Sequence, residues 1–140
     1  MDTVILIAAV CLMGIAAVWD IRTREIPNWV PMGLLILSGM RIWCGSYRWR
    51  GAVVGLVIWG ALSVIAYFLS SRGGKEPGIG AGDIKLMCAL SAFTGFMGFP
   101  AVLLGSCAAG LPLYPLLRSR RIPFAPCLTA GLSFWLLFAA

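Results

Sequence analysis

The sequence predicts an all-α integral membrane protein with six transmembrane helices. Hydrophobic residues make up 61% of the 140 residues and charged residues only 11%, whereas soluble domains are nearer about 45–50% apolar and about 25% charged. A chain this short has too much surface for its volume to hide so many apolar side chains from water. This composition excludes disorder, a soluble globular enzyme and a disulfide-stapled secreted module. The length fits a single membrane domain over residues 1–140.

The first predicted span covers residues 1–19. Residues 3–19 carry no charge, and no basic residue precedes Arg22. A signal peptide would need a basic stretch before its apolar stretch, so we expect a helix that is retained. Pro27 is expected to end the first helix, because a proline pushes the preceding residue into an extended conformation.

The second predicted span covers residues 29–45, with Asn28 as the cap of its helix. Arg41 interrupts this apolar run. An arginine near the end of a span can snorkel towards the head groups, so the charge does not exclude a helix here.

The remaining spans follow from three longer apolar runs. Residues 51–71 form an uncharged run of ample length, and residues 122–140 form the last span. Residues 86–117 form a run of 32 residues without a charge, which as one helix would be about 48 Å long, too long for a single crossing. We therefore divide it into two spans, with a tight turn at residues 98–100, which read Gly-Phe-Pro.

The distribution of basic residues predicts the orientation. The first, third and fifth loops hold eight basic residues: Arg22, Arg24, Arg72, Lys75, Lys85, Arg118, Arg120 and Arg121. The second loop holds the other three, Arg41, Arg48 and Arg50, which are a counter-signal. The positive-inside rule then places the odd loops in the cytoplasm and both termini outside.

Several classes of site are excluded by residues that the sequence lacks. It contains no histidine, which removes Ser-His and Cys-His nucleophile systems and His-ligated zinc sites. No two of its five cysteines form a C-x-x-C pair. We expect no metal and no cofactor. The net charge of +6 lies in loops between apolar runs, so it indicates membrane orientation and contact with lipids rather than binding of nucleic acid.

Two of the five acidic residues stand at the boundaries of predicted spans. Asp20 directly follows the first span, and Asp83 opens the fourth. Two crossings separate them, so both must face the same side of the membrane. Taken singly, Asp20 could pair with a neighbouring arginine and Asp83 could be a plain helix cap. As a pair on one side, next to glycines, they predict an acid–base site.

The sequence around Asp83 suits a protease, whose substrate binds as an extended main chain. Gly80 and Gly82 leave room beside Asp83 for another main chain to approach. The pattern D-x-R-x-x-x-I-P-N after the first span and G-x-G-D-x-K before the fourth resembles the type IV prepilin peptidases, above all the short members associated with Tad-type pilus systems. Residues 122–126, Ile-Pro-Phe-Ala-Pro, are similar to a late segment of that family.

The resemblance implies an intramembrane aspartyl protease with a GxGD-type bundle. It would cut the leader from prepilins or pseudopilins at the cytoplasmic face of the bacterial inner membrane. Asp20 and Asp83 would be the catalytic pair, and the supporting motif residues would be Gly80, Gly82, Lys85, Pro27 and Asn28. Longer family members also N-methylate the new terminus and carry a cysteine-rich segment with C-x-x-C pairs. This sequence lacks such pairs, so neither methyltransferase activity nor zinc is expected.

Three questions stay open at this stage. Helix dipoles favour Asp83 as the base and Asp20 as the acid, but such a pair titrates as a unit. Lys85 could bind an acidic group of the substrate, tune Asp83 or snorkel. The aspartates could instead form the proton or cation site of a small transporter or channel, or be dispensable in a structural pilus-assembly subunit.

Overall fold

The computed structural model describes residues 2–23, 25–45, 47–72, 80–117 and 124–139. The described residues form five helices: α1 (Asp2–Thr23), α2 (Trp29–Trp43), α3 (Trp49–Ser71), α4 (Ala81–Leu117) and α5 (Phe124–Ala139). Three stretches are long and apolar enough to cross a membrane, namely Thr3–Thr23, Trp49–Ser71 and Ala81–Pro112, while α2 and α5 are shorter apolar helices. The prediction of an all-helical membrane protein is confirmed.

Helix α1 is longer than predicted. It continues to Thr23, so Asp20 lies within its last turn and does not follow the helix. Nothing in residues 21–23 breaks a helix, and the Thr23 hydroxyl donates a hydrogen bond to the Trp19 carbonyl oxygen at 2.9 Å. The chain leaves the helical conformation before Pro27, as expected.

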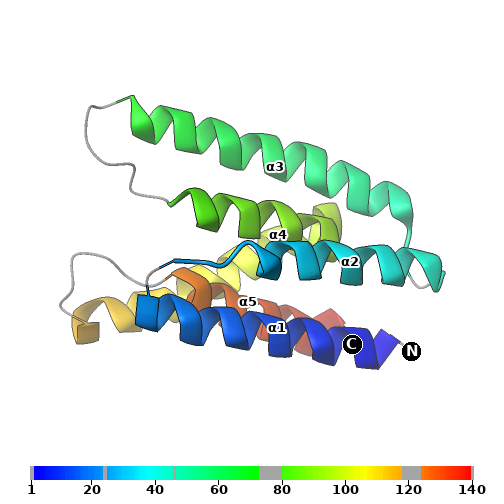
Figure 1. Ribbon diagram of the computed structural model, residues 1–140, viewed down its shortest axis with the longest axis horizontal. Coiled ribbons are helices and arrows are strands. Elements are labelled where there is room, and N and C mark those ends of the chain that lie inside the picture. The colour runs from blue at the N-terminus through cyan, green and yellow to red at the C-terminus, as the bar shows by residue number, and fades with distance from the viewer. Residues whose placement is uncertain (1, 24, 46, 73–79, 118–123, 140) are drawn as a thin grey trace.

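Helix α4 is broken at Gly95. Its backbone there has φ 78° and ψ −177°, a conformation that L side chains rarely adopt. The two halves of α4 run in opposite directions, as the change from green to yellow in Figure 1 shows. The predicted turn at residues 98–100 is therefore wrong by a few residues. Gly98 and Pro100 lie inside the second half, because Gly95 alone in this run takes up a positive φ.

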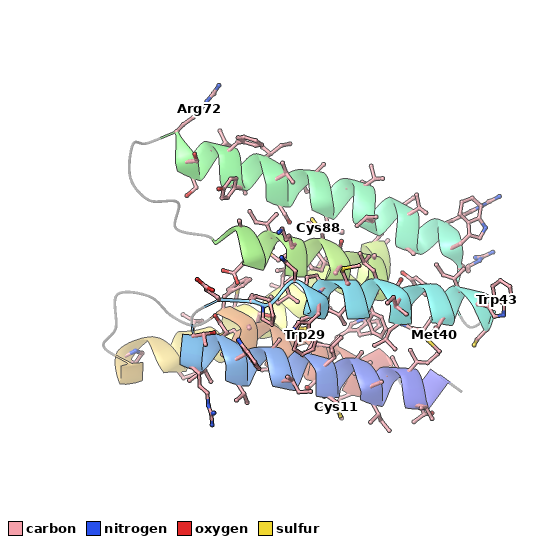
Figure 2. The ribbon with its side chains drawn as sticks, in the orientation of Figure 1. Cys11, Trp29, Met40, Trp43, Arg72 and Cys88 are labelled. Atoms are coloured by element: carbon pink, nitrogen blue, oxygen red, sulfur yellow. The ribbon has the colours of Figure 1, made fainter. Side chains whose placement is uncertain are left out.

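This reversal gives the bundle two distinct ends (Figure 1). At one end α1 finishes and both α4 and α5 begin; we call it the site end. At the other end α2 finishes, α4 breaks and both chain termini lie. Arg72, just after α3, marks the site end in Figure 2, and Trp43 marks the opposite end. Of the predicted loop cations, Arg24, Lys75, Arg118, Arg120 and Arg121 lie outside the described residues, as does Ile122 at the start of the predicted last span.

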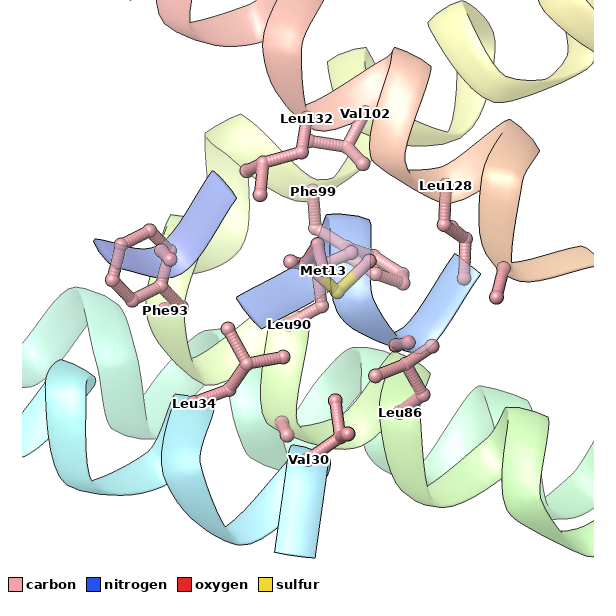
Figure 3. Packing of buried hydrophobic residues seen from close by; sticks show 14 of the residues in the cluster. Met13, Val30, Leu34, Leu86, Leu90, Phe93, Phe99, Val102, Leu128 and Leu132 are labelled. Atoms are coloured by element: carbon pink, nitrogen blue, oxygen red, sulfur yellow. The ribbon is translucent and has the colours of Figure 1, made fainter. Parts of the chain in front are cut away.

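The core lies between α1, α2, α4 and α5. Figure 3 shows fully buried side chains from all four helices meeting there, including Met13, Leu34, Leu90 and Leu128. Helix α4 packs against α2, α3 and α5 and is therefore the central element. Large apolar side chains cover the outside of the bundle as well; Val57 is 62% exposed. Such a surface suits lipid rather than water.

Glycines allow α4 to approach its neighbours closely. A Cβ atom on Gly55 of α3 would lie 2.8 Å from both the Gly95 carbonyl carbon and the Ser91 oxygen. A Cβ atom on Gly131 of α5 would overlap the Val102 carbonyl oxygen. Backbone packs directly on backbone at both places, as is common where helices associate in membranes.

The break in α4 leaves carbonyl groups without their usual partners along the helix, and α2 supplies replacements. The Ser38 hydroxyl donates to the Ala92 oxygen at 3.0 Å. The Arg41 Nη1 donates to the Phe93 oxygen at 3.1 Å. An unpaired backbone carbonyl costs several kcal/mol in a membrane, so these contacts make a non-helical residue tolerable there.

A third carbonyl is freed by Pro100, which has no N–H to donate to Phe96 four residues earlier. The indole Nε1 of Trp59, from α3, donates to the Phe96 oxygen at 3.0 Å instead. The side chain of Trp59 therefore replaces the hydrogen bond that the proline removes.

Arg41 is turned inwards rather than snorkelling, which corrects the sequence-based expectation. Its guanidinium lies 5.0 Å from the ring centroids of both Tyr47 and Phe93. The Tyr47 hydroxyl packs over Gly95 in the space that a Cβ atom would fill. Burial raises the pKa of Tyr47 above its usual value, and the nearby charge of Arg41 offsets only part of that rise. Because Arg41 interacts with groups inside the bundle, its charge says little about which side of the membrane the second loop faces.

Candidate active site

Asp20 is held by the start of another helix. It is only 7% exposed, and its Oδ2 accepts a hydrogen bond of 3.1 Å from the backbone N–H of Ala125, the second residue of α5. Amide groups in the first turn of a helix have no partner within that helix, so they are free to bind a carboxylate. Arg22, the alternative partner in the described residues, is exposed.

Asp83 lies in the first turn of α4, as predicted, and is half-buried. Its backbone N–H donates to the Gly80 oxygen at 3.1 Å, and its carboxylate is hydrogen-bonded by the Gly80 backbone in return. This reciprocal contact fixes the carboxylate at the helix start. The absent side chain of Gly80 is less critical, since a Cβ atom there would make an ordinary 3.5 Å contact with the Asp83 Oδ2.

The segments that carry the two aspartates contact each other directly. A Cβ atom on Gly82 would lie 3.3 Å from the Cβ of Ile26, so the glycine lets the α1–α2 connection pack onto α4. The Lys85 Nζ donates to the Asn28 Oδ1 at 3.1 Å. Asp20 and Asp83 are close enough for the charge of one to act on the other. Six of the seven predicted site residues thus form one cluster, through these contacts or, for Gly80, through its hydrogen bond with Asp83 just before α4.

The seventh, Pro27, shapes the turn between α1 and α2. Its carbonyl oxygen accepts a hydrogen bond from the Val30 N–H at 3.1 Å. Asn28 does stand at the cap position of α2, but its side chain makes no capping hydrogen bond. The expectation that Asn28 caps the helix is therefore wrong, because Lys85 engages the side-chain oxygen instead.

Asp20 lies between two opposing helix dipoles. It is in the last turn of α1, which disfavours a negative charge, but it also faces the start of α5, which favours one. The α5 dipole therefore opposes the α1 dipole at Asp20, whereas Asp83 faces the favourable start of α4. Which aspartate is the acid stays a prediction.

The sequence does not identify Ala125 as a donor to Asp20, because a backbone N–H is present at almost every residue. The only sequence feature that pointed to this region is the segment at residues 122–126, of which Ile122 and Pro123 lie outside the described residues. Among the described residues, no three His, Cys, Asp or Glu side chains gather as a metal site would require. The chemistry that this cluster itself can perform is acid–base catalysis by two carboxyl groups.

Fold and site together define a helical membrane protein with two motif aspartates gathered at one end of its bundle. A model of the type IV leader peptidase family matches residues 7–114, which contain both aspartates and end before α5. The chain belongs to this family. It is also 32% identical over 134 residues to the prepilin leader peptidase/N-methyltransferases of Burkholderia pseudomallei strains 1026b and K96243.

The alignment covers 86% of this chain but 41% of each of these relatives. The chain therefore spans less than half the length of the curated relatives that it matches. No solved structure shows significant similarity to the chain.

Proposed function

We propose that this chain is an intramembrane aspartyl endopeptidase that removes the leader peptide of type IV prepilins or pseudopilins. The observation that carries the proposal is the packing of the two aspartate-bearing segments on each other at one end of the bundle. The two aspartates come from separate motifs, and their segments pack together through Gly82 and Ile26. Family membership and the names of the relatives supply the substrate class.

The reaction is hydrolysis of a peptide bond by two carboxyl groups. One carboxylate takes a proton from water as the water oxygen adds to the carbonyl carbon, and the other carboxyl group protonates the carbonyl oxygen. The C–N bond then breaks, the nitrogen leaves with the proton taken from water, and the second carboxyl group recovers its own. Two carboxyl groups that repel each other electrostatically when both are charged do not both ionise easily. This repulsion favours a state in which the two groups share one proton.

The antiparallel halves of α4 support a bundle with six crossings, in one membrane domain over residues 1–140. We place the site end in the cytoplasm, at the inner membrane, because eight of the eleven basic residues belong to its three connections. Arg41, part of the opposing signal, is used inside the fold. Both aspartates lie in terminal turns of their helices, whereas a transporter would place its acids near the middle of the membrane.

The test is cleavage of a leader-bearing prepilin by the purified chain in detergent or lipid vesicles. Asp20→Asn and Asp83→Asn should each lower the rate by about 10³-fold or more and leave the thermal unfolding profile intact. Glu25→Gln is the matched control, since Glu25 is an exposed acid on the α1–α2 connection, and it should cleave at the normal rate. Cleavage that survives both Asn substitutions in one chain would refute the proposal, and so would a wild-type chain that cuts no prepilin.

A further inference from the structure

The hydrogen bond between α5 and Asp20 takes no direct part in the proton transfers of the proposed reaction. It joins residues that are 105 positions apart in the sequence, and both are buried: Ala125 is fully inaccessible and Asp20 is 7% exposed. The residues matched by the family model end at position 114, so the donor, Ala125, lies outside them and the acceptor, Asp20, inside.

We propose that the backbone N–H of Ala125 is a positioning group of the active site, which holds Oδ2 of Asp20 and thereby orients its carboxyl group towards Asp83. This inference rests on the proposed function. A carboxyl group turns readily about its Cβ–Cγ bond, and a catalytic acid or base must be held close to its productive geometry. One fixed oxygen sets that rotation.

The surroundings of Asp20 show why an amide performs this task. In the described part of the chain, Asp20 acts electrostatically on Asp83 of α4 and on the Cys127 thiol of α5. A cationic side chain in this place would pair with the carboxylate and hold it in one protonation state. An N–H donates without a net charge, so the carboxyl group can still gain and lose a proton during the reaction.

Rigid packing behind Ala125 makes the donor a fixed one. Helix α5 is anchored to α4 by the close approach of Gly131 to Val102, and to α1 by the Thr129 hydroxyl, which donates to the Met13 oxygen at 3.1 Å. The start of α5 is therefore a third wall of the site, beside the end of α1 and the start of α4.

The first experiment replaces the donor hydrogen by the ring carbon of a proline. Ala125→Pro deletes the N–H at a position in the first helical turn, where proline is tolerated because that N–H makes no bond within the helix. We expect kcat for prepilin cleavage to fall about tenfold or more with KM within about threefold, because the carboxyl group loses its orientation while substrate binding is unchanged.

Ala125→Gly is the matched control, because it keeps the N–H and removes the methyl group. The folded Ala125→Gly protein should keep the wild-type kcat, whatever the loss of packing does to stability. An Ala125→Pro protein that is folded and has the wild-type kcat would overturn the proposal.

The second experiment needs neither cleavage nor a proline. Amide hydrogen exchange at the start of α5, in the full chain, should be about tenfold faster in Asp20→Ala than in the wild type, and unchanged in Asp83→Ala. Equal exchange at Ala125 in all three proteins would overturn the contact and the proposal with it. If exchange responds to Asp20 alone while no prepilin is cut, the contact stands and the proposed function is what fails.

Discussion

The site end and the break in α4 place polar groups in an apolar bundle for opposite purposes. At the break, freed carbonyl oxygens receive donors from the side chains of Ser38, Arg41 and Trp59. At the site end the roles are exchanged, because the acceptor is the side chain of Asp20 and the donor is the backbone of Ala125. The break thus uses its polar side chains to complete the backbone, whereas the site end uses the backbone to hold a reactive side chain.

This difference separates the substitutions that should affect stability from those that should affect activity. A buried carbonyl that loses its donor raises the free energy of the folded state and does nothing else. A carboxyl group that loses its orientation leaves the folded state in place and raises the barrier of the reaction. We therefore expect variants at the break to lower the free energy of unfolding, and variants at the site end to lower the rate of cleavage.

The largest effect is expected where α3 touches the break. Gly55→Val would push a side chain into the backbone of Gly95, and should cost about 3 kcal/mol of unfolding free energy or leave no folded protein. Gly39→Ala is the control, because no atom lies within 4 Å of its would-be Cβ atom. It should be neutral or stabilising by up to about 1 kcal/mol. Equal destabilisation by both substitutions, measured by chemical unfolding in micelles, would contradict the close approach.

Arg41→Met should cost about 1.5–3 kcal/mol of unfolding free energy, since it removes a charged donor from the Phe93 carbonyl. Tyr47→Phe is the matched control: its hydroxyl is buried and has no hydrogen-bond partner among the residues that the structure describes, so its removal should be neutral or slightly stabilising. The kcat of the protein that stays folded should be unchanged in both. A snorkelling arginine would instead make Arg41→Met nearly neutral.

Trp59→Phe should cost about 1 kcal/mol, because the Phe96 carbonyl loses its indole donor. In a Pro100→Ala background the cost should shrink, because the alanine restores a backbone N–H that can bond to Phe96 along the helix. Unfolding free energies of the wild type, both single variants and the double variant give the coupling directly. Additive effects would mean that the indole and the missing N–H are unrelated.

The sequence predicted the helical class and the convergence of both motifs at one end of the bundle, because these follow from long apolar runs and from the parity of crossings. It placed the turn in the fourth apolar run wrongly, since three residues, Gly95, Gly98 and Pro100, all signal a turn. Only the surroundings select Gly95: donors from α2 and the glycine of α3 meet there.

The inward position of Arg41 and the role of Ala125 were also beyond prediction. A charged residue near a helix end looks the same in a sequence whether it reaches head groups or a broken helix. A backbone amide carries no sequence signal at all. Both depend on contacts between distant parts of the chain, separated by 52 positions for Arg41 and 105 for Asp20.

The smallest effect is expected at the exposed contact between Lys85 and Asn28. We expect Lys85→Met to lower kcat/KM about two- to fivefold through kcat, by loosening the α1–α2 connection beside Asp83. Asn28→Leu should cause a loss of the same size, and the double variant should be no worse than either single one. Asn28→Asp keeps an acceptor for the ammonium group and should retain most of the activity.

Variants of this pair also separate the three sequence-based interpretations of Lys85. If it bound an acidic group of the substrate, Lys85→Met would raise KM and Asn28→Leu would not. Tuning of Asp83 would move the pH profile in Lys85→Met alone, and snorkelling would leave Asn28→Leu fully active. A hydrogen bond that positions the site predicts matched losses in kcat from both sides, because it fails in the same way whichever partner is removed.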